Sequence, residues 1–140
     1  VWLAVTVDDY DGNRLRSGQE ISLVVELCNA MSLDTVLVNC SIPEAVNIAV
    51  GALAGRGLRV GAYANGFTHI NEAFLEPGAT VDVLQKRKDL DPEAYAGFAA
   101  GWVTRGAGIV GGCCEVGPDH IALLAKRFKS SAGIGTGQEN

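Results

Sequence analysis

Two adjacent cysteines, Cys113 and Cys114, follow a short apolar segment and the pair Gly111–Gly112. Adjacent cysteines rarely bond to each other, because the peptide that joins them strains the disulfide geometry. We therefore interpret them as two separate thiols directed at a common target. A third cysteine, Cys40, ends another apolar segment. Three thiolates suit a zinc ion and leave its fourth coordination position open, which is typical of a catalytic zinc site. The spacing alone also allows a simpler interpretation, in which all three are small buried residues at strand–helix junctions.

The segments around these cysteines predict strands that alternate with helices. Four apolar, β-branched segments are typical of buried strands: Val1–Val7, Asp34–Cys40, Gly57–Tyr63 and residues 107–112. Apolar residues at helical spacing follow each strand, with a segment of no strong period at residues 64–90. Signals for helix starts are the capping-box spacings Ser17–Glu20 and Ser41–Glu44, the pair Asp91–Pro92, and Pro118.

This order of elements predicts an α/β fold built from parallel βαβ units. In such sheets, functional residues collect at the carboxyl ends of the strands. Cys40 ends the second predicted strand, and Cys113 and Cys114 follow the fourth. We therefore expect all three thiols at the same edge of the sheet.

The composition limits the classes of partner. The 140 residues have a hydrophobic fraction of 48%, a charged fraction of 19% and a formal net charge of −5. This charge argues against nucleic acid or an anionic membrane as the main partner. No apolar stretch approaches the roughly 20 residues that span a bilayer, and the first residues lack the basic segment of a signal peptide. Four cysteines do not make a disulfide scaffold, so we predict a reduced, cytoplasmic protein.

Four segments together resemble the homocysteine S-methyltransferase family. The segment GGCCEVGPDHI (residues 111–121) looks like the double-cysteine signature of that family, and this motif is highly specific. Three weaker segments occur in the family order: LRSGQEI (15–21), VNCSIPEAV (38–46) and GAYANG (61–66). The resemblance covers nearly the whole chain. It departs from the family pattern at three positions. A glycine is usual at the position of Leu37, a proline at that of Ala64, and an uncharged or basic residue is frequent at that of Glu115.

The resemblance implies a zinc-dependent enzyme. Cys40, Cys113 and Cys114 would be the zinc ligands. Asn39 either contacts substrate or only finishes its strand, and Asn65 is a second candidate for substrate contact. A zinc-bound homocysteine thiol would take a methyl group from a small activated donor of the S-methylmethionine, S-adenosylmethionine or betaine type, giving methionine. No segment for cobalamin or folate follows the double-cysteine helix.

The resemblance also implies that the chain is the second half of a (β/α)8 barrel, strands five to eight. We expect residues 1–128 to form this half and residues 129–140 to be a disordered tail. Four open strands cannot close a barrel and leave two unpaired edges. We therefore expect the chain to form a homodimer or to need its N-terminal half, and not to turn over homocysteine efficiently in isolation.

The other notable residues have simpler interpretations. We expect Cys28, Trp2 and Trp102 in the core, and His120 in a structural role rather than as a ligand. Asp8 and Asp9 follow the first strand. We expect them in a solvated turn, which is a simpler interpretation than contact with a substrate amino group. His69 is expected in solvent.

Two alternative functions stay open at this stage. The chain is a non-catalytic zinc-binding fragment if it kept the motif but lost the substrate pocket. It is a redox or structural thiol protein if it binds no metal. Binding of both zinc and homocysteine would favour the enzyme, zinc binding alone the non-catalytic fragment, and no zinc binding the thiol protein.

Overall fold

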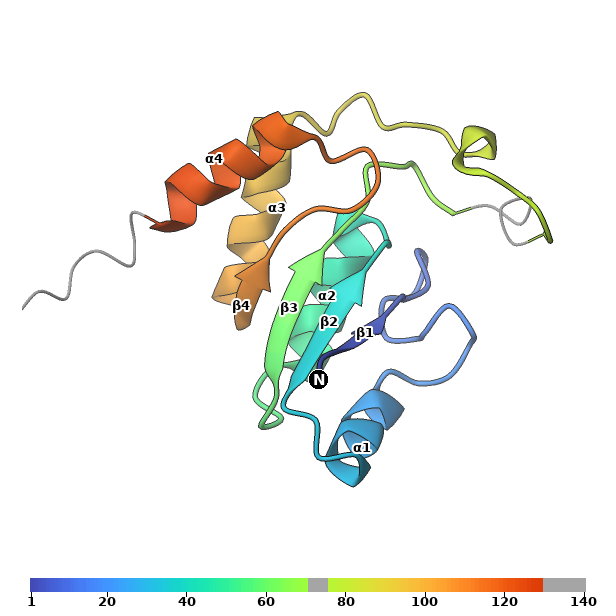
Figure 1. The fold of residues 1–140 in the computed structure, drawn as a ribbon, viewed down its shortest axis with the longest axis vertical. Coiled ribbons are helices and arrows are strands. Elements are labelled where there is room, and N and C mark those ends of the chain that lie inside the picture. Colours follow the sequence, from blue (N-terminus) through green and yellow to red (C-terminus); the bar gives the residue numbers. More distant parts are fainter. Residues whose placement is uncertain (71–75, 130–140) are drawn as a thin grey trace, which may run out of the picture.

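Strands and helices alternate along the chain, as predicted (Figure 1). The computed structural model describes residues 1–70 and 76–129. The strands are β1 (Leu3–Val5), β2 (Thr35–Asn39), β3 (Arg59–Tyr63) and β4 (Ala107–Val110). The helices are α1 (Ser22–Ala30), α2 (Pro43–Leu53), the short 3-10 helix η2 (Val81–Val83), α3 (Pro92–Thr104) and α4 (Pro118–Lys129). Each strand lies within the segment that the sequence predicted for it.

Within the described residues the four strands form one parallel sheet in the order β1-β2-β3-β4. Parallel neighbours need a crossover connection, and a helix supplies each of them, α1 between β1 and β2, α2 between β2 and β3, and α3 between β3 and β4. This confirms the predicted α/β fold. All four carboxyl ends therefore lie at one edge of the sheet.

The core lies between the sheet and the helices on one of its faces. Side chains of β2 and β3 on this face, Val36, Val38, Val60 and Ala62, are at most 1% exposed. They pack against the apolar sides of α2 and α3, whose largest buried side chains include Leu53, Tyr95 and Trp102. Burial of this surface is the main stabilising term of the fold.

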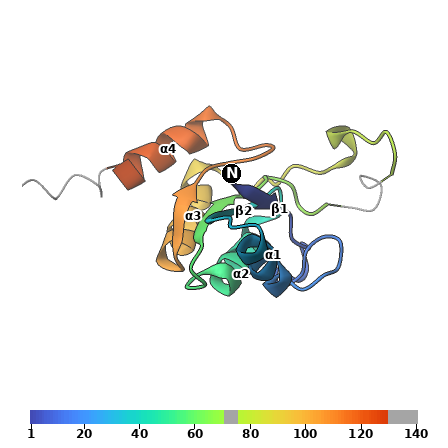
Figure 2. The ribbon, with the colours of Figure 1, turned by 60° about the horizontal axis from the view of Figure 1, so that its bottom comes forward.

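The opposite face of the sheet has no helix on it in the described residues (Figures 1 and 2). Because side chains alternate along a strand, Ala4, Leu37, Gly61 and Ile109 share this face, and their register places them in one row across the strands. Ala4 is exposed, while Leu37 and Ile109 are half-buried. A Cβ at Gly61 would lie 2.2 Å from the Leu37 Cδ2 atom, so the Leu37 side chain fills the space above the glycine.

The helix starts agree only in part with the prediction. Asp91 caps α3, because its carboxylate accepts the Ala94 N–H at 2.8 Å, and Pro118 opens α4 as expected. The two predicted capping boxes are wrong: α1 and α2 begin after Ile21 and Ile42, and neither has a side-chain cap. The Ser41 hydroxyl instead accepts the Val7 N–H at 3.0 Å, a partner 34 positions away.

Trp2 corrects a second expectation. Trp102 is fully buried, and its indole N–H donates to the Pro43 carbonyl at 3.3 Å. Trp2 is 57% exposed, because it precedes the edge strand β1 and shares the uncovered face with Ala4. Of the tail predicted at residues 129–140, only Lys129 is described, and it ends α4; the rest lies outside the described residues.

Candidate metal centre

Three cysteines meet at the carboxyl ends of β2 and β4. Cys40 directly follows β2, and Cys113 and Cys114 follow β4 after Gly111–Gly112. The three sulfur atoms lie within 4.8 Å of one another, and those of Cys113 and Cys114 are 3.9 Å apart. Sulfur atoms about 2.3 Å from one tetrahedral zinc ion are about 3.8 Å apart. The structure thus brings together the three thiols that the sequence singled out.

The segment at the end of β3, residues 63–66, joins the two loops that carry the cysteines. Its backbone hydrogen-bonds the backbone of all three cysteines: the Cys40 N–H donates to the Tyr63 carbonyl (3.3 Å), the Cys113 N–H donates to the Ala64 carbonyl (3.0 Å), and the Gly66 N–H donates to the Cys114 carbonyl (2.8 Å). This segment therefore sets the separation between Cys40 and the cysteine pair. Residues 64–66 follow the third predicted strand, and only the resemblance of GAYANG to a family segment connected them with the site.

Two glycines let the chain pack tightly around this segment. A Cβ at Gly112 would lie 2.2 Å from the Val116 Cγ1 atom, and a Cβ at Gly66 would lie 2.9 Å from the Glu115 Cβ atom. Neither distance is tolerated between real carbon atoms. Both positions therefore require glycine for close approach rather than for a positive φ.

The electrostatics of the cluster favour a cation. Burial raises the pKa of the Cys40 thiol to about 12, with a further contribution from the neighbouring Cys113. Burial first, and Cys113 second, also raise the pKa of Cys114. Thiolates this close repel one another, so the protons stay on until a positive charge compensates. Three soft sulfur donors in this arrangement fit a zinc ion.

Two asparagines and a tyrosine lie beside the cysteines. Asn65 is completely buried; its Oδ1 atom accepts the Phe67 N–H at 3.1 Å, and its Nδ2 atom has no hydrogen-bond partner within the described chain. Asn39 pairs with Tyr63 in the strand register. Burial, followed by the nearby Cys113, raises the pKa of Tyr63. Sequence reasoning missed Tyr63, although it stands in GAYANG.

His120 has a structural role, as expected. Its Nδ1 atom accepts the Gly117 N–H at 3.3 Å, so Nε2 carries the proton and donates to the Leu90 carbonyl at 3.0 Å. The Tyr95 ring packs edge-on against the imidazole, with the ring centroids 5.7 Å apart. The Tyr95 hydroxyl in turn lies 2.8 Å from the Gly111 carbonyl oxygen. Both imidazole nitrogens are therefore occupied, and the pair supports the loop that carries the cysteines.

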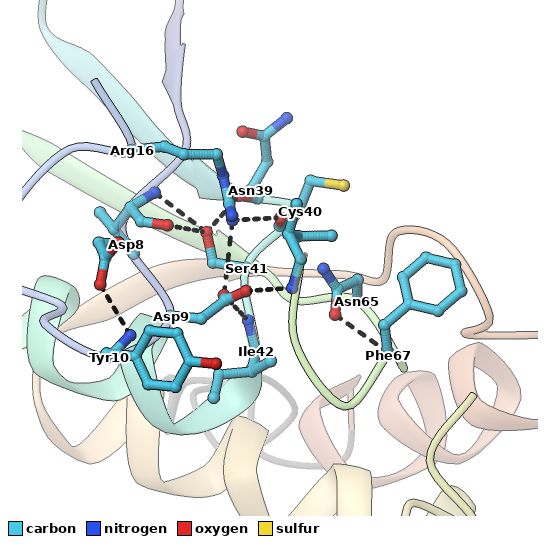
Figure 3. Close-up of polar contacts among 12 residues, drawn as sticks. Asp8, Asp9, Tyr10, Arg16, Asn39, Cys40, Ser41, Ile42, Asn65 and Phe67 are labelled. Atoms are coloured by element: carbon cyan, nitrogen blue, oxygen red, sulfur yellow. Dashed lines mark hydrogen bonds and ion pairs between the residues drawn. The ribbon is translucent and has the colours of Figure 1, made fainter. Parts of the chain in front are cut away.

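Asp9 corrects the expectation of a solvated turn after β1 (Figure 3). Asp8 does cap that turn, by accepting the Tyr10 N–H at 2.8 Å. The Asp9 side chain is only 2% exposed and accepts backbone N–H groups from Ile42 at 2.9 Å and Ile70 at 2.7 Å. Its partners lie in two other loops, which is why no local sequence signal revealed it. His69 is half-buried rather than free in solvent, with its ring 6.1 Å from that of Tyr10.

The negative charge of Glu115 beside the thiols is offset. Its carboxylate lies 2.9 Å from the Lys86 ammonium group. The pair is solvent-exposed, so its contribution to stability is small. The ion pair limits the electrostatic repulsion between Glu115 and the neighbouring cysteines.

Comparison with known proteins decides the family. The sequence model of homocysteine S-methyltransferases matches residues 1–128. The chain belongs to the homocysteine S-methyltransferase family. Among solved structures, it is similar to the homocysteine methyltransferase MmuM from Escherichia coli in its oxidized form, with a TM-score of 0.59 and 24% identity. That match covers 84% of this chain and 33% of the MmuM chain, so the chain spans about a third of the length of that relative.

No match is found among the curated proteins. No helix among residues 1–70 and 76–129 combines the length and the apolar character that a membrane crossing requires.

Proposed function

We propose that this chain is part of an enzyme that transfers a methyl group to the thiol of homocysteine. The single observation that supports the proposal most strongly is the meeting of Cys40, Cys113 and Cys114 at the carboxyl edge of the sheet in a member of this family. In this proposal the three thiolates hold a zinc ion. A zinc ion with three thiolate ligands supplies a fourth position, at which a substrate thiol loses its proton at neutral pH.

The residues around the cysteines would orient the substrate. The fully buried Asn65 Nδ2 atom has no acceptor within residues 1–70 and 76–129, and a substrate carboxylate would supply one. Asn39 and Tyr63 lie next to the cysteines and offer further polar contacts. The sulfur of homocysteine then forms a bond to the methyl carbon as the bond from that carbon to the donor's sulfonium or ammonium centre breaks. The donor leaves as a neutral sulfide or amine, and methionine is the product.

The donor in this proposal is small, of the S-methylmethionine, S-adenosylmethionine or betaine type. We further propose that residues 1–128 act as the second half of the barrel and that turnover needs the other half. Efficient methyl transfer requires both substrates in near-attack geometry, and one face of this sheet lacks a covering layer in the described residues. The thiols need a reducing environment, which supports a cytoplasmic location.

A second candidate function is supported by the uncovered face of the sheet. A chain with a metal site and an uncovered sheet face also fits a zinc-binding fragment that performs no chemistry. This alternative predicts zinc binding without homocysteine binding.

Absorption spectroscopy of the cobalt-substituted protein separates the two. Co²⁺ bound by three thiolates gives intense charge-transfer bands, which a fourth thiolate changes. We expect L-homocysteine to shift these bands saturably, and L-homoserine, with a hydroxyl in place of the thiol, to leave them unchanged. Identical spectra with and without homocysteine would support the non-catalytic fragment.

A further inference from the structure

The Asp9 carboxylate connects three loops at the carboxyl edge of the sheet. It lies in the loop after β1, it accepts the Ile42 N–H from the loop after β2, and it accepts the Ile70 N–H from the segment after β3. The side chain is 2% exposed, so water does not compete for these bonds. A single buried charge thus fixes the relative positions of the loops from three neighbouring strands.

Arg16 carries this connection to Cys40. Its guanidinium lies 3.5 Å from the Asp9 Oδ1 atom and donates to the Cys40 carbonyl at 3.3 Å (Figure 3). The Arg16 side chain is only 19% exposed, which strengthens both contacts. The carboxylate therefore has a cationic partner, and that partner contacts the peptide of a cysteine in the cluster.

Cys40 needs such support because its backbone is strained. Its φ is +46°, in the left-handed region that residues other than glycine rarely adopt. Such a conformation persists only where its surroundings fix it, and it recurs at functional sites. Arg16 bonds the Cys40 carbonyl, Asp9 bonds the Ile42 N–H two residues later, and the Cys40 N–H donates to Tyr63. In Figure 3 the Cys40 sulfur points away from the Asp9 carboxylate, so these contacts act on the backbone rather than on the thiol.

We propose that Asp9 and Arg16 are positioning residues that hold the Cys40 backbone in its left-handed conformation and so direct its thiol towards Cys113 and Cys114. The inference rests on the proposed metal site for its effect on metal affinity. Its effect on the backbone does not depend on that site. Neither residue touches a thiol, and neither is a catalytic residue.

Three variants and one control test the role of the pair. Asp9→Asn keeps the size of the side chain but removes its charge and replaces one acceptor oxygen by a donor. Arg16→Gln leaves the Asp9 bonds to Ile42 and Ile70 in place and removes the guanidinium at Cys40. Asp8→Asn is the matched control, because among the described residues the Asp8 carboxylate accepts hydrogen bonds only from its own turn. Arg16→Lys keeps a cationic donor at this position and should therefore retain part of the metal affinity.

The first measurement is Co²⁺ affinity, by titration of the thiolate-to-cobalt charge-transfer band. Loss of residues that orient metal ligands weakens binding about 10- to 100-fold. We expect weakening of that size in Asp9→Asn and Arg16→Gln, with reduced band intensity, a smaller loss in Arg16→Lys, and wild-type binding in Asp8→Asn. Wild-type affinity and spectra in folded Asp9→Asn and Arg16→Gln would overturn the proposal.

The second measurement is amide hydrogen exchange of the metal-free chain. We expect the amides of residues 40–42 to exchange at least 10-fold faster in Arg16→Gln and Asp9→Asn, and at the wild-type rate in Asp8→Asn. Unchanged exchange in the two variants would contradict the inference. If the wild-type chain itself binds no Co²⁺, the proposed metal site fails and the exchange data alone decide the role of the pair. If Asp9→Asn does not fold, Arg16→Gln carries the test, since it leaves the buried carboxylate bonds in place.

Discussion

At the scale of the residue, Gly112 shows how closely the cysteine loop is packed. A Cβ there would overlap the Val116 side chain and lie 3.3 Å from the Ile121 Cδ1 atom. Overpacking of this kind costs about 1–3 kcal/mol. We therefore predict that Gly112→Ala lowers the free energy of unfolding by about that amount, measured by urea denaturation of the metal-free chain.

A glycine in open surroundings provides the control. Gly97 lies within α3, and a Cβ there would meet no atom within 4 Å. Replacing an exposed helical glycine by alanine stabilises a helix by about 0.5–1 kcal/mol. Gly97→Ala should therefore raise the free energy of unfolding. Equal effects of the two substitutions would show that steric contact at Gly112 is unimportant.

The Cys40 thiol gives a pH dependence with a defined sign. Its pKa is raised from 9.0 to about 12, by burial first and by Cys113 second. The folded chain thus binds this proton more tightly than the unfolded chain, and the resulting stabilisation is complete below about pH 9 and is lost as the pH rises towards 12. We predict that, without metal, the free energy of unfolding falls more between about pH 8 and about pH 11 in the wild type than in Cys40→Ser. Parallel pH profiles for the two proteins would contradict this assignment.

The sequence predicted the meeting of the three cysteines because it follows from topology. Once Cys40 and the pair Cys113–Cys114 are assigned to the ends of parallel strands, they must lie at one edge. It did not predict Asp9, whose partners Ile42 and Ile70 stand 33 and 61 positions away. A buried carboxylate that bonds distant backbone groups leaves no local pattern in the sequence.

At the scale of the element, the start of α3 is a test of capping. The Asp91 side chain accepts the Ala94 N–H, and Pro92 takes the first helical position. Loss of such a cap costs about 1 kcal/mol. We predict that Asp91→Ala lowers the free energy of unfolding by about that amount in a denaturation experiment.

Ser17→Ala is the matched control for this element. Ser17 has the sequence spacing of a cap, but its hydroxyl contacts Gln19 and α1 begins at Ser22. The substitution should change the free energy of unfolding by less than about 0.5 kcal/mol, as for an ordinary surface position. A loss as large as that of Asp91→Ala would mean that Ser17 does cap the helix.

The Ser41 capping box was predicted wrongly and the Asp91 cap correctly, because among the described residues only Ser41 of the two has a distant hydrogen-bond partner. The S-x-x-E pattern describes contacts within four residues, and it applies only if no distant partner competes. Ser41 has such a partner in the Val7 backbone, because β1 and β2 lie side by side. The Asp91 carboxylate instead accepts the N–H of Ala94, three residues later, so a local contact decides its role.

At the scale of the whole molecule, the uncovered face of the sheet is the main consequence of the fold. Ala4 and Trp2 are exposed there, and Leu37 and Ile109 are only half-buried. Apolar surface in water costs roughly 25 cal/mol per Å². We predict that the 140-residue chain associates with itself at micromolar concentration, with an average mass above 14.6 kDa in sedimentation or light scattering.

The outcome of that experiment also tests the need for the other half of the barrel. A monomer that unfolds cooperatively and binds no dye specific for apolar surface would show that this sheet is self-sufficient. The sequence could indicate the uncovered face only through its resemblance to a longer family, since alternation of strands and helices is the same in a half barrel and in a complete α/β sheet.

In the proposed function, Cys40, Cys113 and Cys114 together hold a zinc ion. Zinc content per chain, measured on reduced, zinc-loaded protein after dialysis against a competing chelator, tests it most directly. We predict one zinc per wild-type chain and loss of zinc in each of the variants Cys40→Ala, Cys113→Ala and Cys114→Ala. Cys28→Ala should keep the metal, because Cys28 is fully buried in α1 and lies outside the cluster. Full retention of zinc in all three cluster variants would contradict the claim.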